Sequence, residues 1–212
     1  SYTANRAAIT DNLVAYYSFD DTPNDAAGGN HGTLQNSPTY AGGKFSKAIS
    51  LNGSSQSVLV ADNGNFSNLT NFTFAAWIYP NALSGNRNIL GKFYGGSADG
   101  NFELRTTGSN PEVGFNYSGQ QWAVCTSATA LSTTTWYHLA ATYDGSNLKI
   151  YINGVLDKTC SQTNAIATNS RSVTIGQRGD NAQFWSGVLD EIRIYSRAMS
   201  AEDIGVLYSH RL

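Results

Sequence analysis

Short alternating segments that end at tight-turn signals recur along this chain, and they constrain its fold more than any other feature. Residues 72–79 alternate between large and small side chains and end at Pro80. Residues 136–143 end at Asp144-Gly145, and residues 148–152 end at Asn153-Gly154. Such dipeptides beside alternating segments are the strongest local signal for β-hairpins. No part of the chain shows a long helical period. We therefore expect an all-β protein of roughly eleven to thirteen short strands in two antiparallel sheets packed face to face.

The end of the chain combines one further strand with the start of a helix. Residues 187–195 place aliphatic residues on both sides of Asp190-Glu191, a pattern typical of a strand with alternating faces. Ser200 is a favourable N-cap, and Asp203 stands at the capping-box position. We expect a strand followed by a short C-terminal helical turn. The adjacent Asp190 and Glu191 should then point to opposite faces of the strand.

The length and the charge of the chain limit its organisation and its partners. The 212 residues fit a single β-sandwich domain over residues 1–212. The formal charge of −2 and the low share of charged residues, 13%, give no electrostatic reason to expect nucleic acid as a partner. No apolar run approaches the roughly 18–20 residues of a membrane span, so we expect no membrane insertion. We interpret the chain as a mature fragment of a larger secreted protein.

Cys125 and Cys160 are the two cysteines of the chain. They are too few for a four-ligand zinc site, and they do not form a C-x-x-C motif. A disulfide between them is favoured in a secreted or cell-surface β-protein, with two free thiols as the alternative. A catalytic cysteine is disfavoured because no nearby histidine offers a base.

Six blocks follow one another in a characteristic order: residues 13–20, 30–34, 45–53, 72–80, 136–154 and 187–204. In this order they resemble the bacterial laminin-G-like family of concanavalin A-like jelly-roll domains. The resemblance extends over residues 11–208 and is weakest over residues 81–134. It implies a curved β-sandwich of the kind shared by lectins and laminarinase-type glycosidases. Members of the family bind sugars or proteins, or serve as spacers in adhesins and carbohydrate-active enzymes.

The resemblance also implies one structural calcium ion where the first and last strands meet. The matching positions are Asp20, Asn52, Gly53 and Asp190, with Asp21 and Asp25 as weaker candidates. Calcium takes six to eight hard oxygen ligands, and turns such as Asn52-Gly53 expose backbone carbonyls. The alternative is that Asp20 caps a turn and that Asp190 pairs with a nearby arginine or lysine.

The chain lacks the signatures of a catalytic site. Laminarinase-type enzymes carry two catalytic carboxylates at E-x-D-x-x-E spacing on one strand, and no such run occurs here. Glu103 is followed two residues later by Arg105, and Glu112 stands alone. His31, His138 and His210 are far apart, and His138 lies in a segment typical of a packed sheet. We expect a protein that is not an enzyme.

The weakly matching middle of the chain and the 177–185 loop hold the residue types of a sugar site. Such sites combine an aromatic platform with planar hydrogen-bonding side chains. Trp122 and Trp185 are the best platforms, because Trp77 and Trp136 lie in strands typical of the family core. The alternative is that Trp122 and Trp185 also pack in the core or at a sheet edge. The candidate ligand residues are Arg87, Arg105, Asn116, Tyr117, Gln120, Gln121, Trp122, Gln177, Arg178, Asp180 and Trp185.

Two functions from different classes follow. The first is a non-catalytic carbohydrate-binding module of a secreted or cell-surface protein, attached to other domains and bound to a glycan or polysaccharide. The second is a structural or protein-interaction domain of an adhesin-like surface protein without a glycan site. An exposed aromatic side chain beside arginine or glutamine in a concave groove would favour the first.

Overall fold

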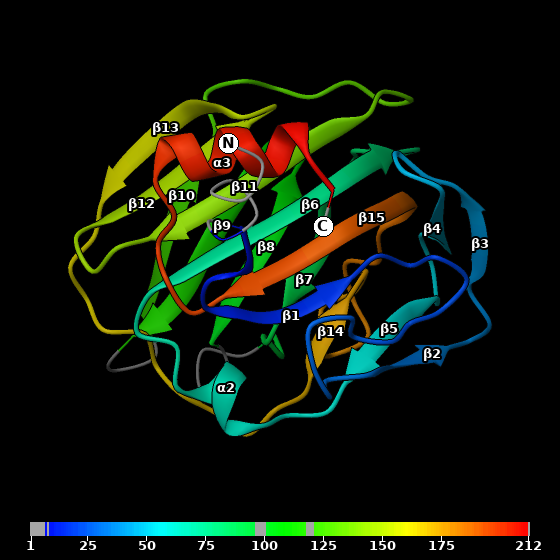
Figure 1. The fold of residues 1–212 in the computed structure, drawn as a ribbon, viewed down its shortest axis with the longest axis horizontal. Helices are drawn as coiled ribbons and strands as arrows, with labels where there is room; N and C mark the ends of the chain where they lie inside the picture. The colour runs from blue at the N-terminus through cyan, green and yellow to red at the C-terminus, as the bar shows by residue number, and fades with distance from the viewer. Residues whose placement is uncertain (1–6, 8, 96–100, 118–120, 212) are drawn as a thin grey trace.

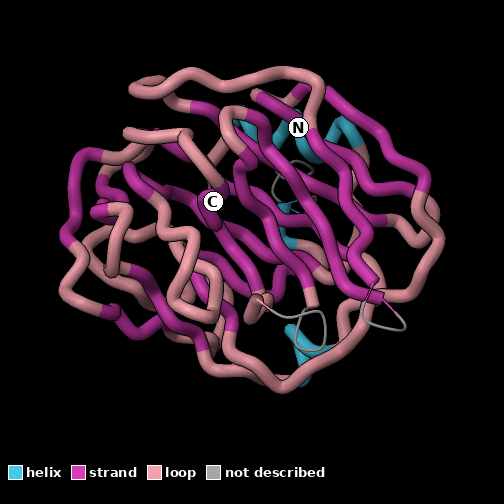
Figure 2. The backbone as a smooth tube through the Cα atoms, turned by 180° about the vertical axis from the view of Figure 1, so that it is seen from behind, coloured by secondary structure: helices cyan, strands magenta, loops and turns pink. Residues whose placement is uncertain are grey.

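The computed structural model describes residues 7, 9–95, 101–117 and 121–211. Within these ranges the chain forms a β-sandwich of two antiparallel sheets, as the turn pattern predicted. Figure 1 shows sheet A in front of sheet B, and Figure 2 shows the same sandwich from the sheet B side. The described residues contain fifteen strands, because several short strands lie in segments that the sequence pattern left as loops.

Sheet A contains eight strands, including the first and the last strand, β1 and β15. β1 pairs with β15, and the remaining strands follow the order β13-β12-β11-β6-β15-β4-β3. Their bounds are β1 (Leu13–Tyr17), β3 (Thr39–Gly42), β4 (Lys47–Asn52), β6 (Phe72–Pro80), β11 (Tyr137–Tyr143), β12 (Asn147–Ile152), β13 (Val155–Ser161) and β15 (Ser186–Tyr195).

Sheet B contains seven strands in the order β10-β9-β8-β7-β14-β5-β2. Their bounds are β2 (Gly32–Gln35), β5 (Ser57–Val60), β7 (Asn86–Gly91), β8 (Phe102–Thr107), β9 (Asn110–Tyr117), β10 (Gln121–Thr126) and β14 (Val173–Ile175). Strands β8, β9 and β10 form a meander, and its outer face carries the predicted ligand residues Arg105 and Trp122.

The core lies between the two sheets and follows the alternation of the strands. Phe74, Leu104, Phe115 and Ile150 belong to one buried cluster that both sheets line. A second, smaller cluster lies outside sheet A, where the helix α3 (Ala201–Ser209) packs Ile204 onto the sheet. Burial of this kind contributes about 25 cal/mol for each Å² of apolar surface removed from water.

The C-terminal prediction is confirmed in its main features. Residues 186–195 form β15, and α3 begins with the Ser200/Asp203 capping box. One detail was wrong, because a β-bulge between Asp190 and Arg193 adds a residue to the strand and Glu191 has φ +52°. Asp190 and Glu191 therefore both lie between the core residues Leu189 and Ile192, away from the core.

The predicted disulfide is present. Cys125 on β10 and Cys160 on β13 are joined with a Cα–Cα distance of 5.7 Å. Because β10 is an edge strand of sheet B and β13 an edge strand of sheet A, the bond joins the two sheets at one side of the sandwich. The described residues include no free cysteine.

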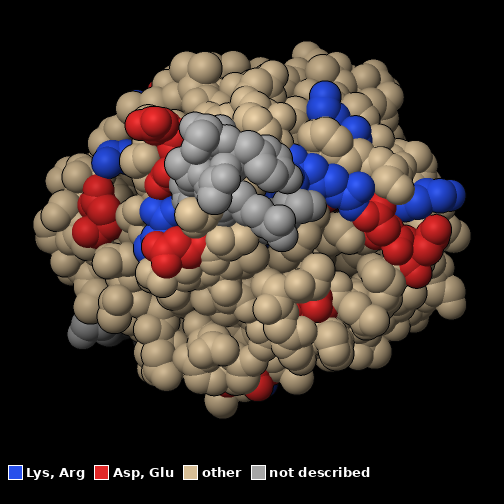
Figure 3. All heavy atoms as spheres, viewed as in Figure 1, with Lys and Arg blue, Asp and Glu red and all other residues tan. Residues whose placement is uncertain are grey.

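The surface charge is low and mixed. Figure 3, seen from the sheet A side, shows acidic and basic side chains in small neighbouring groups on a mostly uncharged surface. Among the described residues, no helix has both the length and the apolar character needed to cross a membrane.

Candidate functional site

The outer face of sheet B is built by the alternation of β8, β9 and β10. Leu104, Val113 and Ala123 point into the core, so their strand neighbours point outward. Arg105, Glu112, Gly114 and Trp122 thereby reach the same outer face from three strands. This placement brings together two of the predicted ligand residues, Arg105 and Trp122.

Two aromatic rings lie next to each other at this face. The rings of Phe93 and Trp122 have their centroids 4.9 Å apart and are tilted by 51°. Both side chains are half-buried, and Val124, two residues after Trp122 on β10, is 43% exposed. We call Phe93 and Trp122 the aromatic shelf. Its rings offer the flat apolar surface on which the C–H face of a sugar ring can pack.

Gly114 makes room for the shelf. A Cβ atom at this position would lie 2.5 Å from a ring carbon of Trp122 and 2.6 Å from the carbonyl oxygen of Ala123. Only glycine therefore lets the indole lie flat across β9.

Arg105 holds two carboxylates, Glu103 and Glu112, beside the shelf. Its Nε donates to Glu112 at 2.8 Å, and its Nη1 donates to Glu103 at 2.9 Å. The guanidinium carbon is 5.9 Å from the Trp122 ring centroid, within reach of a cation–π contact. Thr126 donates to the other oxygen of Glu112 at 2.7 Å. The arginine is thus held rigidly next to the indole, with part of its surface still open.

Glu103 is not placed to act as a catalytic acid. Its side chain is fully buried, and burial raises its pKa above the ordinary value, while Arg105 and the amide of Asn88 oppose that rise. Both carboxylates of this face are bound to the one guanidinium of Arg105. A glycosidase pair instead needs two carboxyl groups facing the sugar.

A loop from the other side of the face adds a second arginine. Arg178 and Asp180 form a two-bond ion pair, with both N–O distances 2.8 Å, and the bond from Arg178 lowers the pKa of the Asp180 carboxyl. The guanidinium carbon of Arg178 lies 5.9 Å from the Phe93 ring centroid. Between the two ends of this pair, Gly179 is in close contact with the Tyr94 ring. Arg178 therefore lies beside the Phe93 ring of the shelf, as Arg105 lies beside the Trp122 ring.

Several predicted ligand residues lie elsewhere, and Trp185 is the main correction. Trp185 is completely buried in the core between the sheets, so its ring cannot serve as a platform. Asn116 and Gln177 are also buried, at 2% and 6% exposure. Tyr117 packs against the core and donates to Gln121.

Two further predicted residues complete this account. Arg87 donates to the backbone oxygen of Phe184 at 2.8 Å and so holds a loop in place. Gln120 lies outside the described residues. Sequence reasoning missed Phe93 and Tyr94, which follow β7 directly; the signal for them was an aromatic pair next to a lysine at the end of an apolar strand.

The predicted calcium ligands do not form one set. Ser186 pairs with Asn52, and Asp190 lies four residues farther along β15, so the two positions are about 13 Å apart. Calcium–oxygen distances of 2.3–2.6 Å do not allow Asn52, Gly53 and Asp190 to hold one ion. Asn52 instead caps its turn, where its side-chain oxygen accepts from Ser54 and Ser55 at 3.0 Å.

Asp20, which follows β1, and Asp190, on β15, both bind backbone amides between the end of β3 and the start of β4. Asp190 accepts from the amide of Phe45 at 3.0 Å, and Asp20 accepts from the amide of Lys47 at 3.0 Å and pairs with Arg211. The other carboxylate oxygen of Asp190 is buried without a partner among the described residues. Burial raises the pKa of Asp190 to about 7. The described residues contain no group of three or more histidine, cysteine, aspartate or glutamate side chains that could hold a metal ion.

Comparison with known structures agrees with this architecture. Domain 4 of AbnA, an extracellular GH43 arabinanase from Geobacillus stearothermophilus, in complex with arabinotriose, has 24% identity and a TM-score of 0.74, over 92% of this chain and 98% of that one. The binding domain of Paraclostridial Mosquitocidal Protein 1 has 20% identity and a TM-score of 0.79, over 94% of this chain. The receptor binding domain of botulinum neurotoxin D has 18% identity and a TM-score of 0.72, over 95% of this chain.

The chain spans about half the length of the two toxin domains, 52% and 53%. At these identities the likeness establishes the fold. No curated protein matches the sequence significantly. The sequence pattern of the concanavalin A-like lectin/glucanases superfamily matches residues 52–205, which is most of the chain. The chain therefore belongs to the concanavalin A-like lectin/glucanases superfamily.

Proposed function

We propose that this domain is a non-catalytic carbohydrate-binding module of an extracellular protein, and that the aromatic shelf is its glycan site. The observation that carries the proposal is the Phe93–Trp122 pair with Arg105 beside the Trp122 ring and Arg178 beside the Phe93 ring. Sugar rings stack on aromatic faces, while planar side chains hydrogen-bond to the hydroxyls. The disulfide and the arabinotriose complex of the similar arabinanase domain support an extracellular, glycan-binding role.

The shelf is pre-formed, which favours binding because few protein side chains have to become ordered when the ligand binds. Arg105 keeps its position through Glu103 and Glu112, and Arg178 through Asp180. Of the five N–H donors of Arg105, three take part in these contacts. A sugar hydroxyl can use the remaining donors without moving the side chain.

A glycan-array screen of the wild-type domain beside two tryptophan variants tests this proposal. Trp122→Ala removes the shelf, and Trp136→Ala is the matched control, because Trp136 is equally half-buried but packs against Tyr79 on sheet A. We expect the wild type and Trp136→Ala to bind the same glycans and Trp122→Ala to lose them. Absence of binding to any glycan by the folded wild type would instead support the structural or protein-interaction alternative.

We also propose a structural calcium ion held by Asp190. The support is its buried carboxylate oxygen, which has no partner among the described residues, while the other oxygen accepts from the Phe45 amide. A divalent cation would keep this buried carboxylate ionised. Thermal unfolding in calcium and in a chelator tests the proposal. Calcium should raise the melting temperature of the wild type and leave that of Asp190→Asn unchanged; an equal response of both proteins would contradict it.

A further inference from the structure

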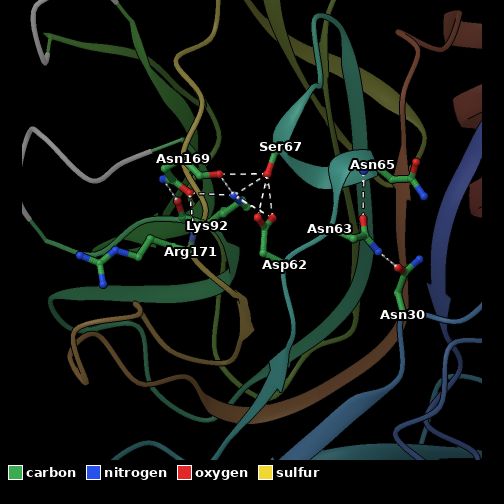
Figure 4. Close-up of polar contacts among 8 residues, drawn as sticks. All are labelled: Asn30, Asp62, Asn63, Asn65, Ser67, Lys92, Asn169 and Arg171. Atoms are coloured by element: carbon green, nitrogen blue, oxygen red, sulfur yellow. Dashed lines mark hydrogen bonds and ion pairs between the residues drawn. The ribbon is translucent and has the colours of Figure 1, made fainter.

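A hollow lies at the rim of the sandwich, between the start of β1 and the short helix α2 (Gly64–Ser67). Its volume is about 560 Å³, within the range of small-molecule sites. Its lining includes four asparagines, Asn12, Asn30, Asn63 and Asn65. In Figure 4, Asn30, Asn63 and Asn65 lie together on one side of α2, and Lys92 with its partners lies on the other. The hollow is therefore separate from the aromatic shelf, whose Phe93 follows Lys92.

A buried carboxylate behind the hollow holds these amides in one arrangement. Asp25, which is 5% exposed, accepts from the backbone amides of Tyr16 at 2.9 Å and Ala27 at 2.8 Å. The backbone amide and the side-chain amide of Asn30 both donate to its other oxygen at 3.1 Å. These four bonds satisfy the charge of Asp25 within the loop, so the loop presents neutral groups to the hollow.

A series of hydrogen bonds between asparagine amide groups continues from Asn30 into the wall of the hollow. The side-chain oxygen of Asn30 accepts from the side-chain amide of Asn63, and the side-chain oxygen of Asn63 accepts from the backbone amide of Asn65 at 3.0 Å. Each bond fixes which end of an amide is donor and which is acceptor. Hydrogen bonds in such a chain polarise one another, and the carboxyl group of Asp25 stands at its start.

The chemistry of the lining selects a class of ligand. None of the ten lining residues carries a charge, so an anionic ligand would find no counter-charge there. Calcium prefers carboxylates, and the oxygens of Asn30 and Asn63 already accept hydrogen bonds. The second amide hydrogen of Asn63 and the exposed side-chain amide of Asn65 can bond to the hydroxyls of a sugar, each of which is both donor and acceptor. Leu13, Val14 and Ala27 add apolar surface for the C–H groups.

We propose that this hollow binds a neutral pentose or hexose unit, as a second sugar site independent of the aromatic shelf. The glycines of the hollow allow a direct test. A Cβ atom at Gly29 would meet no atom within 4 Å, and the φ of Gly29 lies outside the left-handed region. Gly29→Leu therefore adds a bulky side chain to the lining of the hollow without strain in the backbone. Gly42 on β3 is equally open and outside the hollow, so Gly42→Leu is the matched control.

The experiment is an NMR titration of the backbone and side-chain amides with arabinose, galactose and galacturonate, each added alone. We expect one of the neutral sugars to give saturable shifts at Gly28, Gly29, Asn63 and Asn65. These shifts should persist in Gly42→Leu and Trp122→Ala and disappear in Gly29→Leu. Asn65→Ala is a second variant. Because the Asn65 side chain is exposed, its removal should weaken sugar binding about tenfold through lost hydrogen bonds without disturbing the core.

Each other result would overturn the inference. Shifts that survive in Gly29→Leu, or an equal response to galacturonate, would show that the hollow is not a site for neutral sugars. Shifts confined to the surroundings of Trp122 would remove the second site and leave the shelf proposal intact. Loss of binding in Trp122→Ala with no shift at Gly28 and Gly29 would have the same meaning. No shift with any of the three sugars would reject the hollow as a sugar site.

Discussion

The disulfide between Cys125 and Cys160 should provide a large part of the stability of this domain. It connects the edge strands of the two sheets, which are otherwise held together by apolar packing. The perturbation is the double variant Cys125→Ala/Cys160→Ala. Alanine keeps the β-carbon in both strands, and of the two removed sulfur atoms only that of the buried Cys125 leaves space in the core.

The expected loss follows from the length of chain that the bond closes. The two cysteines are 35 residues apart in sequence. In the chain-entropy description, a closed loop of this length stabilises the folded state by about 4 kcal/mol at 25 °C. For a chain of about 200 residues, each kcal/mol shifts the melting temperature by roughly 2–4 °C. The double variant should therefore melt roughly 10 °C below the oxidised wild type.

Urea unfolding of three samples measures this effect: the oxidised wild type, the wild type with a reducing agent, and the double variant. The reduced wild type and the double variant should have similar free energies of unfolding, both about 4 kcal/mol below the oxidised protein. A difference below about 1 kcal/mol would refute the reasoning, since it would mean that the denatured chain gains little freedom when the bond is absent.

Three further substitutions test other parts of the structure. Lys92→Met should lower the free energy of unfolding in urea by about 3 kcal/mol, near the low end for a broken buried ion pair. The loss is at the low end because the partner Asp62 is 20% exposed and regains water. An unchanged free energy of unfolding would contradict a stabilising Lys92–Asp62 pair. Burial raises the pKa of Glu103 above 4.5, so the folded state holds that proton to higher pH than the unfolded state. The stability of the wild type relative to Glu103→Gln should therefore fall as the pH rises above about 4.5, and a constant difference across a pH series would be the opposite result. Gly114→Ala should displace the Trp122 ring, lowering stability by about 1–3 kcal/mol and weakening glycan binding, which denaturation and a binding titration would show; unchanged binding would mean that the flat indole is not needed.

The sequence was sufficient for the architecture because the architecture depends on local patterns. Alternation sends Leu148 and Ile150 into the core, and Ser200 with Asp203 begins α3 as expected. These features need only neighbouring residues to agree. The resemblance to a known family then supplied the arrangement of the two sheets, which local patterns cannot give.

The site depended on register between strands, which the sequence does not state. Trp122 and Trp185 have similar surroundings in sequence, yet one lies on the outer face of sheet B and the other is fully buried. Asn52 and Asp190 both match family positions, but their places along paired strands keep them apart. The bulge at Glu191 brings Glu191 to the same face as Asp190, and no composition signal marks it.

The measurement that tests the central claim most directly is a calorimetric titration of the best-binding glycan from the array with the wild type, Phe93→Ala, Trp122→Ala and the control Trp136→Ala. The account predicts that both shelf variants bind about tenfold more weakly or worse, because each removes one of the two rings on which the sugar stacks, while the control binds as the wild type does. Equal affinity of all four proteins would show that the glycan binds away from the shelf and would contradict the account.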